Sequence, residues 1–209
     1  MVNKDKIQGL LETYFVCSNK AWIQDDGSVQ VDGDVTLIKP PPQGRIPVKF
    51  NLVSGHFKAI NMGLVSLSNI PDECSELFLT NNQLTDLDDC PPYLITLDVS
   101  NNKLKNFVNG PESAHEITAY NNPLSSLEGL PDEYDELEIN ITYDAHLPLL
   151  RLINSTKVRV GHPGSGYKRL QPFEPVNTII NKYLGQGKSG ALKAAAELVR
   201  AGYKENARW

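Results

Sequence analysis

The chain has few cysteines, few aromatic residues and no long apolar run, and these shortages exclude several classes of protein. Three cysteines among 209 residues (Cys17, Cys74 and Cys90) form no C-x-x-C pair, which argues against a disulfide framework and against a cysteine-built zinc site. No apolar run reaches the roughly eighteen residues that a membrane-spanning helix needs. Hydrophobic residues still make up 40% of the chain, so the sequence predicts a packed core.

A recognisable leader is also lacking at the N-terminus. Residues 1–15 carry Asp5 and Glu12 and show no uninterrupted apolar core before a small-residue cleavage site. We therefore expect an N-terminal helix in a cytoplasmic protein rather than a signal peptide.

No complete motif for catalysis, cofactor binding or metal binding is present. Residues 184–190 (LGQGKSG) are similar to a phosphate-binding loop, but the Walker pattern needs glycine where this chain has Lys182, and a helix is predicted before the loop. We interpret the loop as a turn between two helices. The four histidines share no ligand spacing, and no serine lies in a G-x-S-x-G setting. We expect no enzyme activity, no cofactor and no metal.

Charge is present but unevenly distributed. Residues 70–144 contain sixteen Asp and Glu against two lysines, a net charge of −14, whereas residues 145–209 carry eleven Lys and Arg against three Glu, a net charge of +8. The sequence therefore predicts two different surfaces, an acidic middle and a basic end.

The strongest positive signal is a repeat of twenty residues. It shows as two apolar columns, a leucine column, an asparagine column and a proline column. The two apolar columns are Phe57, Leu77, Leu97, Ile117 and Leu137, and Ala59, Leu79, Val99, Ala119 and Ile139. The leucine column is Leu64, Leu84, Leu104 and Leu124, and the asparagine column is Asn82, Asn102 and Asn122. The proline column is Pro71, Pro91, Pro111 and Pro131.

The pattern L-x-L-x-x-N-x-L is the signature of a leucine-rich repeat, and each column has a physical reason. Alternating apolar residues form a short strand whose inward side chains stack on the neighbouring units. An inward Asn satisfies the backbone donors and acceptors of the sharp turn, and the stacked Asn side chains do the same for neighbouring units. The next Leu fills the core, and Pro starts an extended return segment.

We therefore expect an α/β, mostly β solenoid: a short leucine-rich-repeat stack with a parallel concave sheet, an N-terminal helix and hairpin cap, and a C-terminal helical appendage. The expected divisions are residues 1–54 for the cap and an irregular first repeat, 55–160 for the solenoid, and 161–209 for a linker and two helices. Asp32-Gly33 is the expected turn of the hairpin, residues 157–160 are the expected last strand, and Ser189 is the expected N-cap of the last helix.

The repeat also resembles known families. The short proline-containing unit is similar to the twenty-residue repeats of bacterial type III secreted effectors. Residues 26–55, 81–87 and 126–131 resemble elements of the leucine-rich-repeat proteins of tailed bacteriophages, and the resemblance covers roughly residues 26–160. It implies the repeat architecture and a phage origin. The ubiquitin-ligase domain that often accompanies such repeats in effectors is not implied, because the short tail contains no cysteine.

The outward positions of the strands predict a binding surface, because aromatic residues occur there among acidic ones. An ordinary polar repeat face with two incidental aromatics, Phe78 and Tyr120, is the alternative. The protein-binding residues expected on the concave face are Lys58, Glu76, Phe78, Thr80, Asp98, Ser100, Glu116, Thr118, Tyr120, Glu136 and Glu138, and the candidate contacts in the basic tail are Arg159, Lys168 and Arg169.

These features lead us to expect a non-enzymatic protein–protein interaction module. The phage resemblance implies that its partner is a host protein such as a defence component, inhibited by occlusion in the cytoplasm of the bacterial host. Two alternatives stay open: a protein that interacts with nucleic acid or mimics DNA through its acidic surface, and a repeat protein like the secreted effectors.

Overall fold

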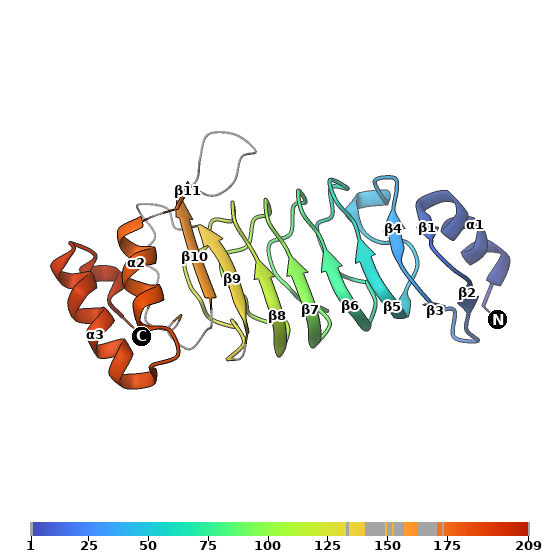
Figure 1. Ribbon diagram of the computed structural model, residues 1–209. Helices are drawn as coiled ribbons and strands as arrows, with labels where there is room; N and C mark the ends of the chain where they lie inside the picture. The colour runs from blue at the N-terminus through green and yellow to red at the C-terminus, as the bar shows by residue number, and fades with distance from the viewer. Residues whose placement is uncertain are drawn as a thin grey trace.

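The structure, a computed structural model, describes residues 2–132, 134–140, 149, 152, 157–162, 171, 172 and 174–208. It is a solenoid in which strands stand side by side in one row, with helices at both ends (Figure 1). Successive turns contribute β5 (Phe50–Lys58), β6 (Glu73–Phe78), β7 (Tyr93–Asp98), β8 (Ser113–Thr118), β9 (Glu136–Asn140) and β10 (Lys157–His162). Each pairs with the next in parallel, which confirms the predicted mostly β solenoid.

The strand register follows the sequence repeat. Leu77 pairs with Leu97, Leu97 with Ile117, and Ile117 with Leu137. Residues 157–160 form part of β10, and Val158 pairs with Leu137, so the predicted last strand is confirmed. The inward columns are buried throughout the stack, and so are the four prolines at positions 71, 91, 111 and 131.

The asparagine column forms a ladder of hydrogen bonds inside the core. The Asn102 amide donates to the carbonyl oxygens of Leu79 and Val99, both at 3.0 Å, and its oxygen accepts from the Leu84 N–H at 3.0 Å. Asn82 and Asn122 make the equivalent contacts one turn away on either side. Each side chain thus joins its own turn to the preceding one, as the sequence predicted.

Two further columns lie in left-handed backbone conformation, and neither was predicted from the sequence. The first asparagine of each Asn-Asn pair has a φ near +60°, and a second column recurs eight residues later. Asn, Asp and Gly tolerate this region better than other residues, and their recurrence at a spacing of twenty is the signal that reveals both columns. The two columns are Asn61, Asn81, Asn101 and Asn121, and Asn69, Asp89, Asn109 and Gly129.

The N-terminal cap contains α1 (Lys4–Tyr14), β1 (Phe15–Cys17), β2 (Ala21–Ile23), β3 (Val29–Val31) and β4 (Val35–Leu37). β1 pairs with β4 and β2 with β3, both antiparallel, while β3 and β4 both lie along β5. The cap hairpin is present, but its turn was predicted at the wrong place. The chain reverses at residues 24–28, between β2 and β3. β3 and β4 then run in the same direction along β5, and Asp32-Gly33 is a short interruption between them.

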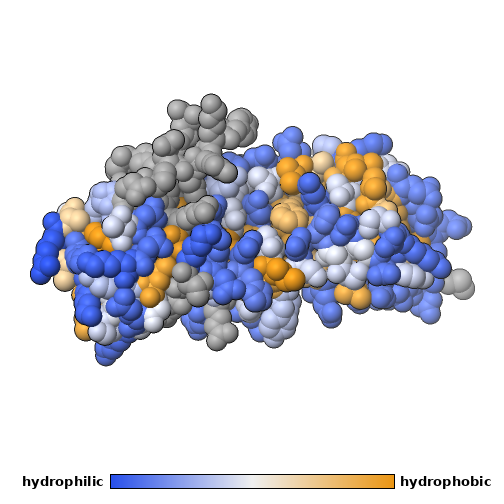
Figure 2. Space-filling model, viewed as in Figure 1, coloured by the Kyte–Doolittle hydropathy of each residue, from blue (hydrophilic) through white to orange (hydrophobic). Residues whose placement is uncertain are grey.

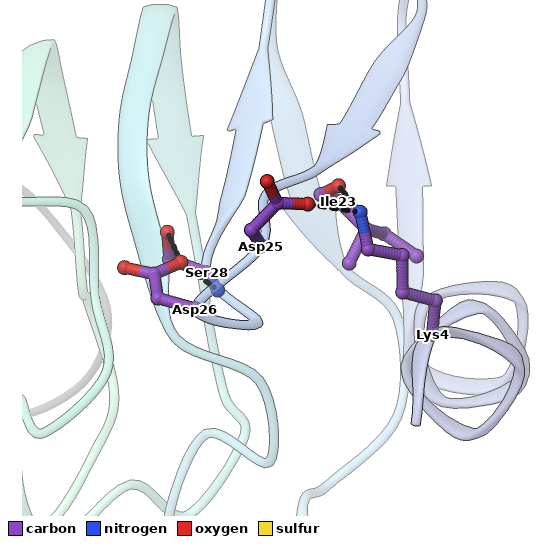
Figure 3. A network of polar contacts seen from close by, with 5 residues as sticks. All are labelled: Lys4, Ile23, Asp25, Asp26 and Ser28. Carbon is purple, nitrogen blue, oxygen red and sulfur yellow. Dashed lines mark hydrogen bonds and ion pairs between the residues drawn. The ribbon is translucent and has the colours of Figure 1, made fainter. Parts of the chain in front are cut away.

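Polar contacts explain why the reversal occurs at residues 24–28 (Figure 3). The Asp26 carboxylate accepts from the backbone N–H and the hydroxyl of Ser28, at 2.9 and 2.7 Å, and these bonds lower the pKa of Asp26. Lys4 of α1 donates to the carbonyl oxygen of Ile23 at 3.1 Å and to Asp25 at 2.9 Å. Gly27 supplies the positive φ of +89°.

The interruption at Asp32-Gly33 is matched by a β-bulge in β5. The register between β5 and β6 shifts between Val53 and His56, because β5 has one extra residue there. Gly55 donates its N–H to the carbonyl oxygen of Gly33 at 2.9 Å, and a Cβ on Gly55 would lie 2.1 Å from a carboxylate oxygen of Asp34. Glycine is therefore required where the cap meets the first repeat.

The C-terminal cap consists of β11 (Gln171–Pro172), α2 (Glu174–Tyr183) and α3 (Gly187–Arg200). β11 pairs with β10, and α2 packs against β10 with Val176 and Ile180 fully buried. The two predicted helices are confirmed, and residues 184–186 form the turn between them. Ser189 was wrongly predicted as an N-cap, because α3 begins earlier, with Gln186 as its N-cap.

The described part of the chain contains no helix long and apolar enough to cross a membrane.

Candidate functional site

The outward side of β5–β10, which we call the strand face, brings most of the predicted binding residues together. The parallel register aligns them in two rows across the strands. One row is Lys58, Phe78, Asp98, Thr118, Glu138 and Arg159, and the other is His56, Glu76, Thr96, Glu116, Glu136 and Lys157. Glu116 and Glu136 are therefore direct neighbours.

Several predicted residues occupy less accessible or undescribed positions. Phe78 is half-buried and its ring meets the His56 ring edge-on, with 5.9 Å between centroids. Thr80 and Tyr120 are half-buried just beyond their strands. Arg159 is placed in β10 by its backbone pairing, whereas Lys168 and Arg169 lie outside the described residues.

Ser100 was predicted to be exposed, and this is wrong. Its side chain is fully buried, and its hydroxyl has no hydrogen-bond partner among the described residues. Its backbone N–H donates to the Asp98 carboxylate at 3.0 Å, a local contact at the end of β7. A small side chain at this position is enclosed, whereas the larger Thr80 and Tyr120 remain partly accessible in the neighbouring turns.

Two strongly exposed side chains of the strand face, Tyr93 and Ile95, were not predicted from the sequence. Tyr93 and Ile95 of β7 are 66% and 52% exposed. They lie on either side of the buried Leu94, which belongs to a further inward column with Cys74, Ala114 and Tyr134. Each residue of this column lies three positions before the first apolar residue of the L-x-L pattern. Because side chains alternate along a strand, an inward Leu94 predicts that Ile95 faces outward.

Two hollows lie on either side of β7. The first, which we call the β6 hollow, has a volume of about 340 Å³ and is lined by residues of β5, β6 and β7, among them Glu73 and Tyr93, and by Asp72, which directly precedes β6. The second, which we call the β8 hollow, has a volume of about 430 Å³ and is lined by Ile95, His115, Glu116, Asp135, Glu136 and Lys157. Tyr93 and Ile95 thus form a ridge between two hollows that both contain carboxylates.

Part of this negative charge is already paired. Lys49 forms an ion pair with Asp72, and Lys157 lies 2.6 Å from the Glu136 carboxylate. The His115 ring lies 2.7 Å from Asp135. The Tyr93 hydroxyl donates to Glu112 at 3.0 Å, and this bond raises the pKa of Tyr93.

Cys74 and Cys90 are poorly suited to nucleophilic attack. Burial raises the pKa of Cys74 to about 12 and, together with the nearby Cys74 thiol, that of Cys90 to about 12. A thiol with so high a pKa is a poor nucleophile at neutral pH. Within the described ranges, no group of three or more His, Cys, Asp or Glu is arranged to hold a metal ion. The arrangement instead offers contact area, apolar side chains and fixed negative charge.

Comparison of the chain with protein-family models, with curated proteins and with solved structures gave no match.

Proposed function

We propose that the chain is a non-enzymatic protein-binding module and that its strand face contacts the partner. The observation that carries the proposal is the exposure of Tyr93 and Ile95 on one strand, between two carboxylate-lined hollows. An exposed aromatic and aliphatic pair within a polar surround is typical of interface centres. On the face of the molecule seen in Figure 2, hydrophilic side chains dominate and apolar ones form separate patches.

The nature of the partner is part of the same proposal. Residues 26–160 resemble repeat proteins of tailed bacteriophages, which supports a bacterial host protein as the partner and the host cytoplasm as the place of binding. A solenoid that covers a functional surface of its partner inhibits it by occlusion, without chemistry. A host defence component is the first candidate to examine.

Affinity capture from a bacterial lysate tests the proposal. The tagged chain is compared with the Tyr93→Ala/Ile95→Ala variant and with a matched control, Val65→Ala/Val108→Ala. The control removes two valines that are exposed at 41% and 37% but lie outside the strands. Retained proteins are identified by mass spectrometry, with and without nuclease treatment.

We expect a stoichiometric protein that the wild type and the control retain and the Tyr93→Ala/Ile95→Ala variant loses. If all three chains retained the protein, Tyr93 and Ile95 of β7 would not be part of the binding surface. Material that disappears with nuclease would contradict the proposal in favour of nucleic-acid binding.

A further inference from the structure

The two hollows and the ridge between them define the kind of segment that fits the strand face. We propose that it binds an extended basic polypeptide segment, which places one cationic side chain in each hollow and an apolar side chain against Tyr93 and Ile95. This inference rests on the proposed function and deepens it, because it names the chemistry of the partner.

Charge is the first argument. The β6 hollow contains Asp72, which forms an ion pair with Lys49, and Glu73. The β8 hollow contains Glu116, Asp135 and Glu136 against one lysine, Lys157. Within the described residues, the carboxylates of Glu73 and Glu116 form no ion pair, so each hollow keeps negative charge for an incoming cation. Complementary charge favours a basic partner and speeds its encounter with the surface.

Spacing is the second argument. The β6 hollow is centred on β6, and the β8 hollow extends from β7 to β10. Neighbouring strands lie about 4.8 Å apart, so the two hollows are separated by roughly 12–14 Å across the sheet. An extended chain covers about 3.3 Å per residue, so cationic residues four positions apart match this separation.

Strand periodicity then fixes the position of the apolar residue. In an extended chain, alternate side chains point to the same side, so residues i, i+2 and i+4 all face the surface. A segment with cationic residues at i and i+4 therefore presents residue i+2 to the ridge of β7. Arginine suits the hollows best, because its guanidinium binds a carboxylate through two N–H groups and stacks on an aromatic ring such as that of Tyr93.

Direct binding of a synthetic peptide tests the inference. The probe is fluorescein-labelled Gly-Ser-Arg-Ser-Leu-Ser-Arg-Ser-Gly, measured by fluorescence anisotropy against the full chain. One control peptide has the same composition with the two arginines adjacent, and a second has glutamate in place of arginine. The protein variants are Tyr93→Ala/Ile95→Ala and Glu73→Gln/Glu116→Gln, with Val65→Ala/Val108→Ala as the matched control.

We expect the spaced-arginine peptide to bind at least about tenfold more tightly than either control peptide, a difference of about 1.4 kcal/mol. Each strand-face variant is expected to weaken this binding about tenfold, and the valine control to leave it unchanged. Added salt is expected to weaken peptide binding, because the carboxylates of Glu73 and Glu116 are solvent-accessible. Thermal unfolding followed by circular dichroism checks that every variant is folded.

The outcomes separate this inference from the proposed function. Equal binding of the spaced and adjacent-arginine peptides, or binding that neither strand-face variant weakens, would overturn the inference. Failure of all peptides, together with a lysate partner lost in Tyr93→Ala/Ile95→Ala, would also overturn it but leave the proposed function intact. Peptide binding with the expected losses supports the inference whatever the lysate contains.

Discussion

At the residue scale, the two asparagines of each Asn-Asn pair have different tasks. The first, such as Asn81 or Asn101, takes a positive φ that turns the chain out of the strand. The second, such as Asn102, is buried and hydrogen-bonds to the backbone of two turns. The pair recurs because the turn needs both a left-handed residue and a buried amide.

The buried amide gives the first prediction. Asn102→Ala is expected to lower the free energy of unfolding by about 1–3 kcal/mol, because it leaves the buried Leu84 N–H and the Leu79 and Val99 carbonyl groups without that partner. Urea denaturation followed by circular dichroism measures the loss. The adjacent exposed Lys103→Ala is the control and is expected to stay within about 0.5 kcal/mol. Equal stability of the two variants would contradict a stabilising role for the Asn102 hydrogen bonds.

The left-handed column gives the second prediction. Asn81 has a φ of +60°, and a β-branched residue is strained in this region. Asn81→Val is therefore expected to destabilise the protein by about 1–2 kcal/mol, and Asn81→Gly to cost less. The same urea titration compares the two. A larger loss for glycine than for valine would show that the backbone conformation does not matter at this position.

At the element scale, both ends of the stack are covered. β3 and β4 lie along β5 at one end, and α2 packs on β10 at the other. The Asn181 amide also donates to the Val158 carbonyl oxygen at 3.0 Å, which ties α2 to the last repeat strand. A solenoid needs such caps, because an open end would expose the apolar columns to water.

The contact between α2 and β10 gives the third prediction. Ile180 is fully buried, and Ile180→Ala is expected to cost about 2–5 kcal/mol at the C-terminal cap. Hydrogen exchange should rise in β10 and α2 while β6 and β7 remain protected, because repeats contact only their neighbours. Thr178→Ala, an exposed position on the same helix, serves as the control. Uniform loss of protection over the whole stack would contradict a local role for the cap.

At the scale of the whole molecule, one apolar core runs from Leu11 in α1 to Leu198 in α3. Leu97 lies in its middle, fully buried and paired with Leu77 and Ile117. A cavity at Leu97 should therefore disturb the turns on both sides of it.

The fourth prediction tests this continuity. Leu97→Ala is expected to lower the free energy of unfolding by about 2–5 kcal/mol and to reduce hydrogen-exchange protection in β6 and β8 as well as in β7. The exposed Thr85→Ala is the control. Loss of protection confined to β7 would mean that the turns do not form one cooperative core.

The candidate site was harder to predict from the sequence than the fold. The repeat spacing predicts which residues lie in each row of the strand face, and the structure places them there. Exposure depends on neighbours in adjacent turns, so Ser100 was wrongly expected outside and Tyr93 and Ile95 were overlooked. The β6 and β8 hollows involve three or more strands each, and no local pattern describes them.

The sequence alone determined the period, the parallel stacking and the inward columns of the L-x-L pattern, because a fixed spacing of apolar residues can be buried in only one register. Its composition also determined the acidic charge of the middle turns. Tertiary structure decided where the cap hairpin turns, since the Lys4 contacts with Ile23 and Asp25 and the close approach of Gly55 to Gly33 join segments that are distant in the chain. It also decided which outward residues are accessible, because exposure is a property of packed neighbours rather than of sequence spacing.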